Sequence, residues 1–143
     1  MYRSGYKSFC RMYSSADAAK RVGVTANGGS YSVSQGVDRL PEISSVPYLD
    51  VVATLSQDER KLTLFCVNRS LDTDISTSIH FQHFSPGRSA AVHLLTSASI
   101  SDANDEVNPT NVEPVDSSEA VPAGGWSHIF PHASVTVISI DRK

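Results

Sequence analysis

The sequence lacks most of what metal-binding and secreted scaffolds require. Only two of its 143 residues are cysteines, Cys10 and Cys66, and neither has a CxxC neighbour. No apolar run approaches the ~20 residues that span a bilayer. The net charge of -3 gives no overall positive field for binding nucleic acid. We therefore expect a cytoplasmic chain without a membrane or nucleic-acid partner, and leave open whether Cys10 and Cys66 are bonded.

The few histidines are poorly placed for a metal site. His128 and His132 are four residues apart, but Pro131 lies between them and the segment runs into a strand, so they do not share a helical face. His80 and His83 flank Phe81 and would project to opposite faces of a strand. We expect surface or hydrogen-bonded histidines here, with no metal and no cofactor.

Acidic residues are plentiful, but none has neighbours that would raise the pKa of one carboxyl and keep a second one ionised, as a glycosidase pair requires. A Ser-, Asn-, Asp- and Pro-rich connection covers 97–125, and loops this long are usually functional or lie on another surface. Its Asp102, Asn104 and Glu106 lack the rest of an EF-hand pattern, so turns with Asx caps are expected. No catalytic residue is expected; if the chain is active, the candidates are Asp102, Asp105 and Glu106.

Trp126, the only tryptophan, follows Gly124 and Gly125. It would either stack on a sugar or anchor the long connection, and we favour the anchor because one aromatic ring is a small binding surface. The segment Asn68-Arg69-Ser70 matches the N-glycosylation pattern, which is common by chance. We expect Asn68 to cap a turn instead.

The chain is rich in short apolar segments that alternate with turn signals. With 40% hydrophobic residues it has enough material for the core of one domain. A polar "SQDER" separates two of the segments by a distance suited to a hairpin. A short helical turn is expected within 9–21, with Ser15 as its N-cap. The strand segments predict an antiparallel β-sandwich, and they are 31–33, 49–56, 61–69, 74–82, 90–96 and 134–140.

The strand around "LTLFCV" is apolar on both faces. Leu62, Leu64 and Cys66 would point one way, and Phe65 and Val67 the other. The outer faces of a free two-sheet sandwich are in water and alternate cleanly between apolar and polar residues. We therefore expect one outer sheet face to rest on another layer, a partner domain or a subunit. The alternative is a central strand with a modestly apolar exposed face.

Several motifs, in order, resemble the C-terminal domain of α-L-arabinofuranosidases of glycoside hydrolase family 51. "VPYLD" leads into a hairpin, "LTLFCVNR" follows, and "NRSLD" leads into the next strand. "VHLLTSASISDANDEVNPTNVEPV" is similar to a loop of the family, and "FPHASVTVISI" to its closing strand. The resemblance begins at Phe9, where "FCRMYSSADAAKRVGV" is similar to the family's passage out of the last barrel helix, and it ends at Ile140.

The resemblance implies a jelly-roll sandwich packed on a (β/α)8 barrel that carries both catalytic glutamates. Residues 1–20 would be the remnant of the barrel-to-sandwich connection, and 21–143 the sandwich domain. The expected function is that of an accessory, non-catalytic domain of an intracellular, exo-acting α-L-arabinofuranosidase. It would pack on the barrel, self-associate through exposed apolar strands, and be inactive alone.

Two alternatives stay open. One is a small stand-alone glycoside hydrolase with a carboxylate pair on the sandwich, and the other is a carbohydrate-binding module that uses Trp126 and nearby tyrosines.

Overall fold

The structure is a computed structural model, and it describes residues 12, 20–34, 41–123 and 125–143. These residues form ten strands, all in antiparallel pairs. The strands are β1 (Lys20–Val22), β2 (Ser30–Val33), β3 (Ile43–Pro47), β4 (Leu49–Leu55), β5 (Lys61–Asn68), β6 (Ile75–Ile79), β7 (Pro86–Leu95), β8 (Val115–Ala120), β9 (Trp126–Phe130) and β10 (Ser134–Arg142).

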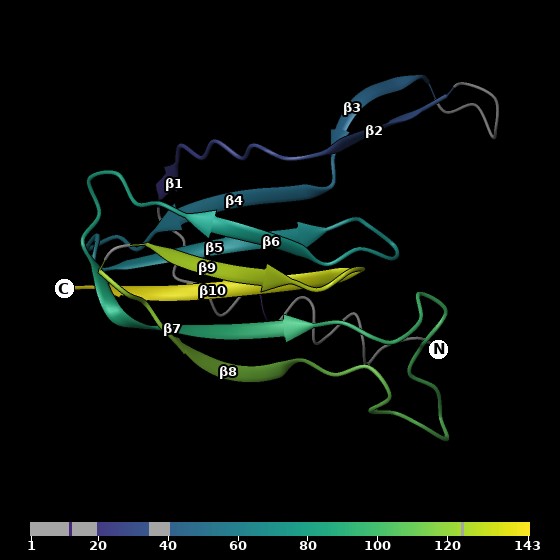
Figure 1. The fold of residues 1–143 in the computed structure, drawn as a ribbon. Coiled ribbons are helices and arrows are strands. Elements are labelled where there is room, and N and C mark those ends of the chain that lie inside the picture. Colours follow the sequence, from purple (N-terminus) through teal and green to yellow (C-terminus); the bar gives the residue numbers. More distant parts are fainter. Residues whose placement is uncertain (1–11, 13–19, 35–40, 124) are drawn as a thin grey trace.

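Two layers make up the body of the molecule (Figure 1). One is a six-stranded sheet with the order β1-β4-β5-β10-β7-β8, and the other is the pair β6-β9, which lies across its inner face. The β2-β3 pair projects from the body as a separate hairpin. The predicted all-β, antiparallel sandwich is confirmed.

Each strand segment expected from the sequence contains an observed strand, and β4 and β5 form the expected hairpin. At its turn, the Ser56 amide donates to the Lys61 carbonyl, 2.9 Å away. The start of the chain differs from the expectation. Ser15 and most of the expected helical turn lie outside the described residues, but Lys20 and Arg21 belong to β1, which pairs with β4. Lys20 and Arg21 thus pair with a neighbouring strand and are not part of a helical turn.

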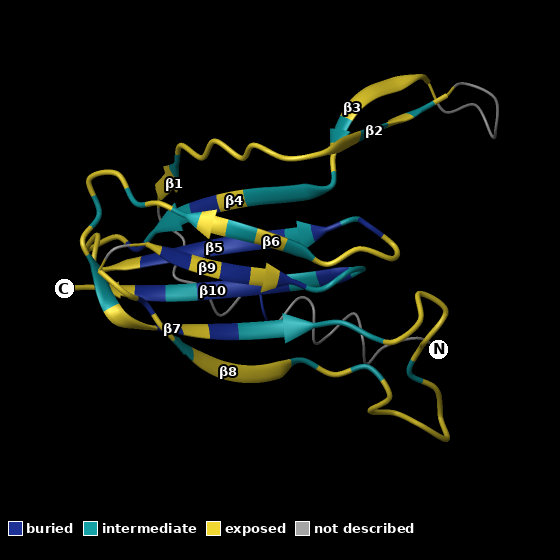
Figure 2. Ribbon diagram, viewed as in Figure 1, coloured by how far each residue is buried: buried dark blue, intermediate teal, exposed yellow. Residues whose placement is uncertain are grey.

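The apolar inner face of β5 fills the space between the sheets (Figure 2). Leu62, Leu64 and Cys66 are buried in one cluster with Trp126 and Phe130 of β9. The cluster continues through the neighbouring strands, with Ala53, Ala90, Val92, Ile138 and Ile140. This is the core of the sandwich, and it explains one of the two apolar faces.

The outer face of β5 is also covered. Phe65 is 7% exposed and packs with Val137 of β10 and with Met12. Val135 and Leu95 pack around this second cluster. The sequence led us to expect a partner domain or subunit over this face. At Phe65 part of the cover comes from Met12 of the same chain, and a further layer over this face stays a prediction.

Candidate functional site

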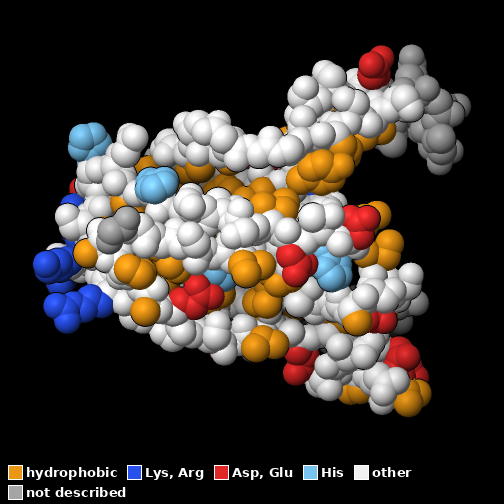
Figure 3. Space-filling view, in the orientation of Figure 1, with side chains coloured by type: hydrophobic (Ala, Val, Ile, Leu, Met, Phe, Trp, Pro, Cys, Tyr) orange, Lys and Arg blue, Asp and Glu red, His pale blue; other side chains and the backbone are white. Residues whose placement is uncertain are grey.

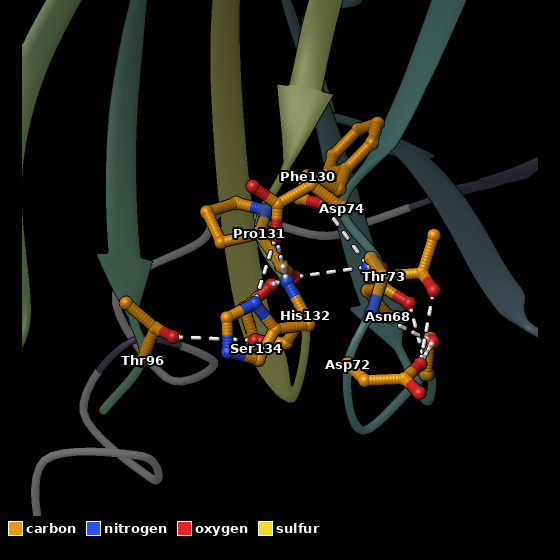
Figure 4. Close-up of polar contacts among 10 residues, drawn as sticks. Asn68, Asp72, Thr73, Asp74, Thr96, Phe130, Pro131, His132 and Ser134 are labelled. Atoms are coloured by element: carbon orange, nitrogen blue, oxygen red, sulfur yellow. Dashed lines mark hydrogen bonds and ion pairs between the residues drawn. The ribbon is translucent and has the colours of Figure 1, made fainter. Parts of the chain in front are cut away.

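The "NRSLD" turn holds the two sheets together where β5 ends (Figure 4). Asn68 is 2% exposed, and its Nδ2 donates to the carbonyl oxygens of Phe130 and Pro131 at 3.0 Å and of Thr73 at 3.1 Å. Its Oδ1 accepts a hydrogen bond from the Ser70 amide at 3.0 Å. Asn68 thus caps its turn, as expected. Because Nδ2 is buried and committed to carbonyls, the glycosylation match at this position has no accessible acceptor.

A second polar contact lies beside this turn. Oδ1 of Asp74 accepts from the backbone amide of His132 at 2.8 Å and lies 2.8 Å from its Nδ1. These hydrogen bonds lower the pKa of the Asp74 carboxyl, and the one to the imidazole has the larger effect. The His132 carbonyl accepts from the Thr96 hydroxyl at 3.3 Å, which links the contact to the end of β7. No sequence pattern predicts this pairing, because the partners lie 58 residues apart.

The acidic candidates lie on the connection between β7 and β8, residues 96–114, which we call the long loop. Asp102 accepts from the Ser99 amide at 3.1 Å and from the Ser97 hydroxyl. Asp105 Oδ1 accepts from the amides of Val107 and Asn108, at 2.9 and 2.6 Å. These carboxylates cap turns of their own loop, as the sequence suggests.

The third acidic candidate, Glu106, is exposed, and no hydrogen bond or ion pair joins it to another described residue. A shallow pocket of about 330 Å³ lies by β1 and β4, and none of the three candidates lines it. The structure therefore does not place Asp102, Asp105 and Glu106 at this pocket.

The long loop is held in shape by asparagine side chains. Asn104 pairs reciprocally with the backbone of Val112, with Nδ2 donating to the carbonyl at 2.9 Å and Oδ1 accepting from the amide at 2.6 Å. Asn111 Nδ2 donates to the Ala103 carbonyl at 3.3 Å. The connection predicted at 97–125 contains one strand, β8.

Trp126 lies in the core, 4% exposed. Its Nε1 donates to Oε2 of Glu119 on β8 at 3.2 Å, and the same carboxylate lies 3.0 Å from Nδ1 of His128. The His128 ring packs between Trp126 and Phe130, with centroid distances of 5.8 and 4.6 Å. Glu119 was not singled out from the sequence. This buried arrangement anchors β8 to β9 and leaves little of the indole for stacking on a sugar.

The described residues hold no group of three or more His, Cys, Asp and Glu side chains that could bind a metal ion. Within the same residues, no helix has both the length and the apolar character needed to cross a membrane. Cys66 is free and 1% exposed, while Cys10 lies outside the described residues. Burial, with a smaller contribution from Asp50, raises the pKa of the Cys66 thiol to about 12.

Comparison with known proteins gives a clear structural match. Neither a protein-family model nor a curated protein matches the sequence. A solved arabinofuranosidase is 23% identical with a TM-score of 0.77, over 87% of this chain and 26% of that one. The family 51 α-L-arabinofuranosidase of Thermotoga petrophila RKU-1 is 26% identical with a TM-score of 0.64, over 70% of this chain and 20% of its own. The α-L-arabinofuranosidase of Thermotoga maritima is 25% identical with the same TM-score and coverage.

These matches confirm the expected resemblance to a domain of family 51 α-L-arabinofuranosidases. The chain spans only a fifth to about a quarter of the solved enzymes named above.

Proposed function

We propose that the chain acts as the accessory, non-catalytic sandwich domain of an α-L-arabinofuranosidase, packed on a catalytic barrel in the cytoplasm. The observation that carries the proposal is the structural match to a limited part of family 51 enzymes, up to 26% of their length. The acidic candidates also fit it, since Asp102 and Asp105 cap their own loop and neither lines the described pocket.

The outer face of the six-stranded sheet is the proposed barrel contact. On β5 and β10 it carries Phe65 and Val137, which are already buried with Met12. The half-buried Val67, Val135 and Leu95 lie beside them in the register, and His93 of β7 pairs with Val137. Val52, the register partner of Phe65 on β4, is 40% exposed. The exposed Val52 and the half-buried side chains beside Met12 are the apolar surface that remains for a contact with another layer.

Met12 supports placing the barrel on this face. It is the described residue that packs on Phe65 and Val137, and it belongs to the segment that resembles the passage out of the last barrel helix. The opposite surface, the outer face of β6-β9, is mostly serine, with Ser76 and Ser78 beside Ser127 and Ile129. A barrel that approaches along its own last helix would therefore reach the six-stranded sheet first.

The face is tested with a pair of matched variants. Val52→Asp places a charge on the proposed contact, and Ile129→Asp places the same charge on the opposite surface, where Ile129 is 60% exposed. Neither side chain belongs to the buried core, so both variants should fold. Binding to the isolated barrel of the Thermotoga petrophila enzyme, measured by calorimetry, should be lost with Val52→Asp and kept with Ile129→Asp. The barrel's own sandwich domain is the positive control.

Dye binding by the chain alone provides a test that needs no barrel. A fluorescent apolar dye should bind the wild-type chain and bind Val52→Asp more weakly, while Ile129→Asp behaves as wild type. Equal loss in both variants, or no loss in either, would place the apolar contact surface elsewhere.

A further inference from the structure

The charged side chains of the sandwich are sorted between its two ends (Figure 3). One end, which we call the basic end, comprises the β4-β5 turn, the start of β7 and the end of β10. Apart from Arg21 and Arg69, every described Lys and Arg lies there and is exposed. These residues are Lys20, Arg60, Lys61, Arg88, Arg142 and Lys143.

The basic end is only partly neutralised. Asp58, Glu59 and Asp141 also lie there, and Glu59 pairs with Lys20 at 2.5 Å. Arg88 and Lys143 form no ion pair with a described residue. The basic end therefore carries a positive net charge.

The other end, which we call the acidic end, comprises the long loop, the start of β8 and the turn after β5. Arg69 is its one described Lys or Arg, and its guanidinium pairs with Asp50 at 2.5 Å. Residues 96–125 contain neither Lys nor Arg. The exposed acids at this end are Asp72, Asp74, Asp102, Asp105, Glu106, Glu113 and Asp116. Two of them contact histidines, Asp74 with His132 at 2.8 Å and Asp116 with His93 at 2.7 Å. A chain with a net charge of only -3 thus carries two strongly unlike ends.

The acidic end also has the features of a preformed contact. Two aliphatic side chains of the long loop stand in solvent, Val107 at 84% and Ile100 at 68% exposed. Since Asn104 and Asp105 already fix the loop backbone, docking it requires little further ordering. At the basic end the Phe84 ring is half-buried beneath the Arg142 guanidinium, 5.0 Å from its centroid, and offers an apolar counterpart.

We propose that the acidic end of one copy binds the basic end of a second copy, head to tail. Unlike charges meet in this arrangement, whereas two acidic ends or two basic ends would repel each other. The occupant is a second copy because one chain carries both complementary surfaces. Such a heterologous contact adds copies in a row or closes a ring, and it does not stop at a twofold dimer. It uses the ends of the strands and leaves the outer sheet face, the proposed barrel contact, untouched.

Salt dependence separates this contact from apolar association. From about 0.1 M to about 1 M salt the Debye length falls from about 10 Å to about 3 Å, so attraction between exposed charges is largely lost. Sedimentation velocity of the wild-type chain should show species larger than a monomer at the lower salt concentration and monomer at the higher one. Association through the apolar outer face would persist or increase with salt.

A charge-swap experiment provides the decisive test. One variant reverses the loop (Glu106→Lys with Glu113→Lys), and the other reverses the basic end (Arg88→Glu with Lys143→Glu). Asp102 and Asp105 are left intact because they hold the loop backbone. Each variant alone should sediment as a monomer, and an equimolar mixture should again form larger species. Glu42→Lys, an exposed change beside β3 and outside the long loop and the basic end, should associate as wild type.

Two outcomes would overturn the head-to-tail contact. One is a wild-type chain that is monomeric at low salt. The other is a mixture of the two reversed variants that stays monomeric while each remains folded by circular dichroism. Neither outcome bears on the barrel contact, because Val52 and the outer sheet face are unchanged in both variants.

Discussion

The side-chain amide of Asn68, at the end of β5, donates a hydrogen bond to the carbonyl oxygen of Phe130, at the end of β9, 3.0 Å away. The two residues belong to different sheets and are separated by 62 positions in the chain. One buried amide therefore fixes where the β6-β9 pair sits on the six-stranded sheet. The motif "NRSLD" has a structural role at the junction of the two layers.

Replacing Asn68 should destabilise the fold directly. Asn68→Ala leaves the carbonyls of Phe130 and Pro131 without their donor in a buried place, and such a loss costs about 1–3 kcal/mol. Urea unfolding followed by circular dichroism measures the effect. Asn111→Ala, which removes an exposed amide contact in the long loop, is the matched control and should change stability by less than about 1 kcal/mol. Equal effects of the two changes would contradict the role given to Asn68.

The Asp74–His132 contact makes a contribution that depends on pH. Its hydrogen bonds lower the pKa of Asp74 below the ordinary 3.8, so the folded state favours the ionised carboxylate. The stabilisation is present above the unfolded pKa and is lost as pH falls through the lower, folded pKa. Asp74→Asn should therefore flatten the fall in stability below about pH 4, whereas Glu42→Gln should leave that fall unchanged. If Asp74→Asn loses stability at low pH as steeply as the wild type does, the contact does not stabilise the fold.

Glu119 should hold the edge strand β8 against β9. Glu119→Ala removes the acceptor for Trp126 Nε1 and the partner of His128 Nδ1, and should cost about 1–3 kcal/mol. Tryptophan fluorescence should also shift to longer wavelength as water reaches the indole. Ser117→Ala, an exposed change on the same strand, controls for any alteration of β8. A spectrum identical to that of the wild type would mean that Trp126 is buried without help from Glu119.

Thr136 offers a change in the stabilising direction. Its Oγ1 is buried on β10 and has no hydrogen-bond partner among the described residues. Cys66 and Leu94 are the register partners of Thr136 on the neighbouring strands. Thr136→Val removes that unsatisfied hydroxyl while keeping a β-branched shape, and should raise the unfolding free energy by about 1 kcal/mol. Thr63→Val is the matched control, since the Thr63 hydroxyl lies 3.4 Å from that of Ser139, and it should bring no gain. A loss of stability in Thr136→Val would indicate a hydrogen bond to water that the hydroxyl keeps in the fold.

Local pattern in the sequence predicted the central strands well. The segments that became β4, β5 and β10 are apolar and bounded by polar turns, and the Asx caps at Asp102 and Asp105 depend on neighbours within three residues. Edge elements were harder to predict. The strand β8 has the sequence "VDSSEA", which lacks an apolar alternation because an edge strand needs little core contact.

Contacts between distant segments could not be predicted from local sequence patterns. Glu119 meets Trp126 across two sheets, and Asp74 meets His132 across 58 positions. The cover on Phe65 by Met12 likewise arises from tertiary packing. Lys20 and Arg21 were assigned to the end of a helical turn within 9–21, and pairing with β4 overrode that local preference.

The most direct measurement for the accessory-domain account is release of nitrophenol from an aryl α-L-arabinofuranoside. It is made with the purified chain alone, with an isolated family 51 barrel alone, and with the two mixed, against a mock purification. The account predicts no turnover by the chain, and a mixture that keeps its activity on heating longer than the barrel does alone. Turnover by the chain above the mock level, abolished by Glu106→Gln, would contradict it and place a catalytic carboxylate on the sandwich.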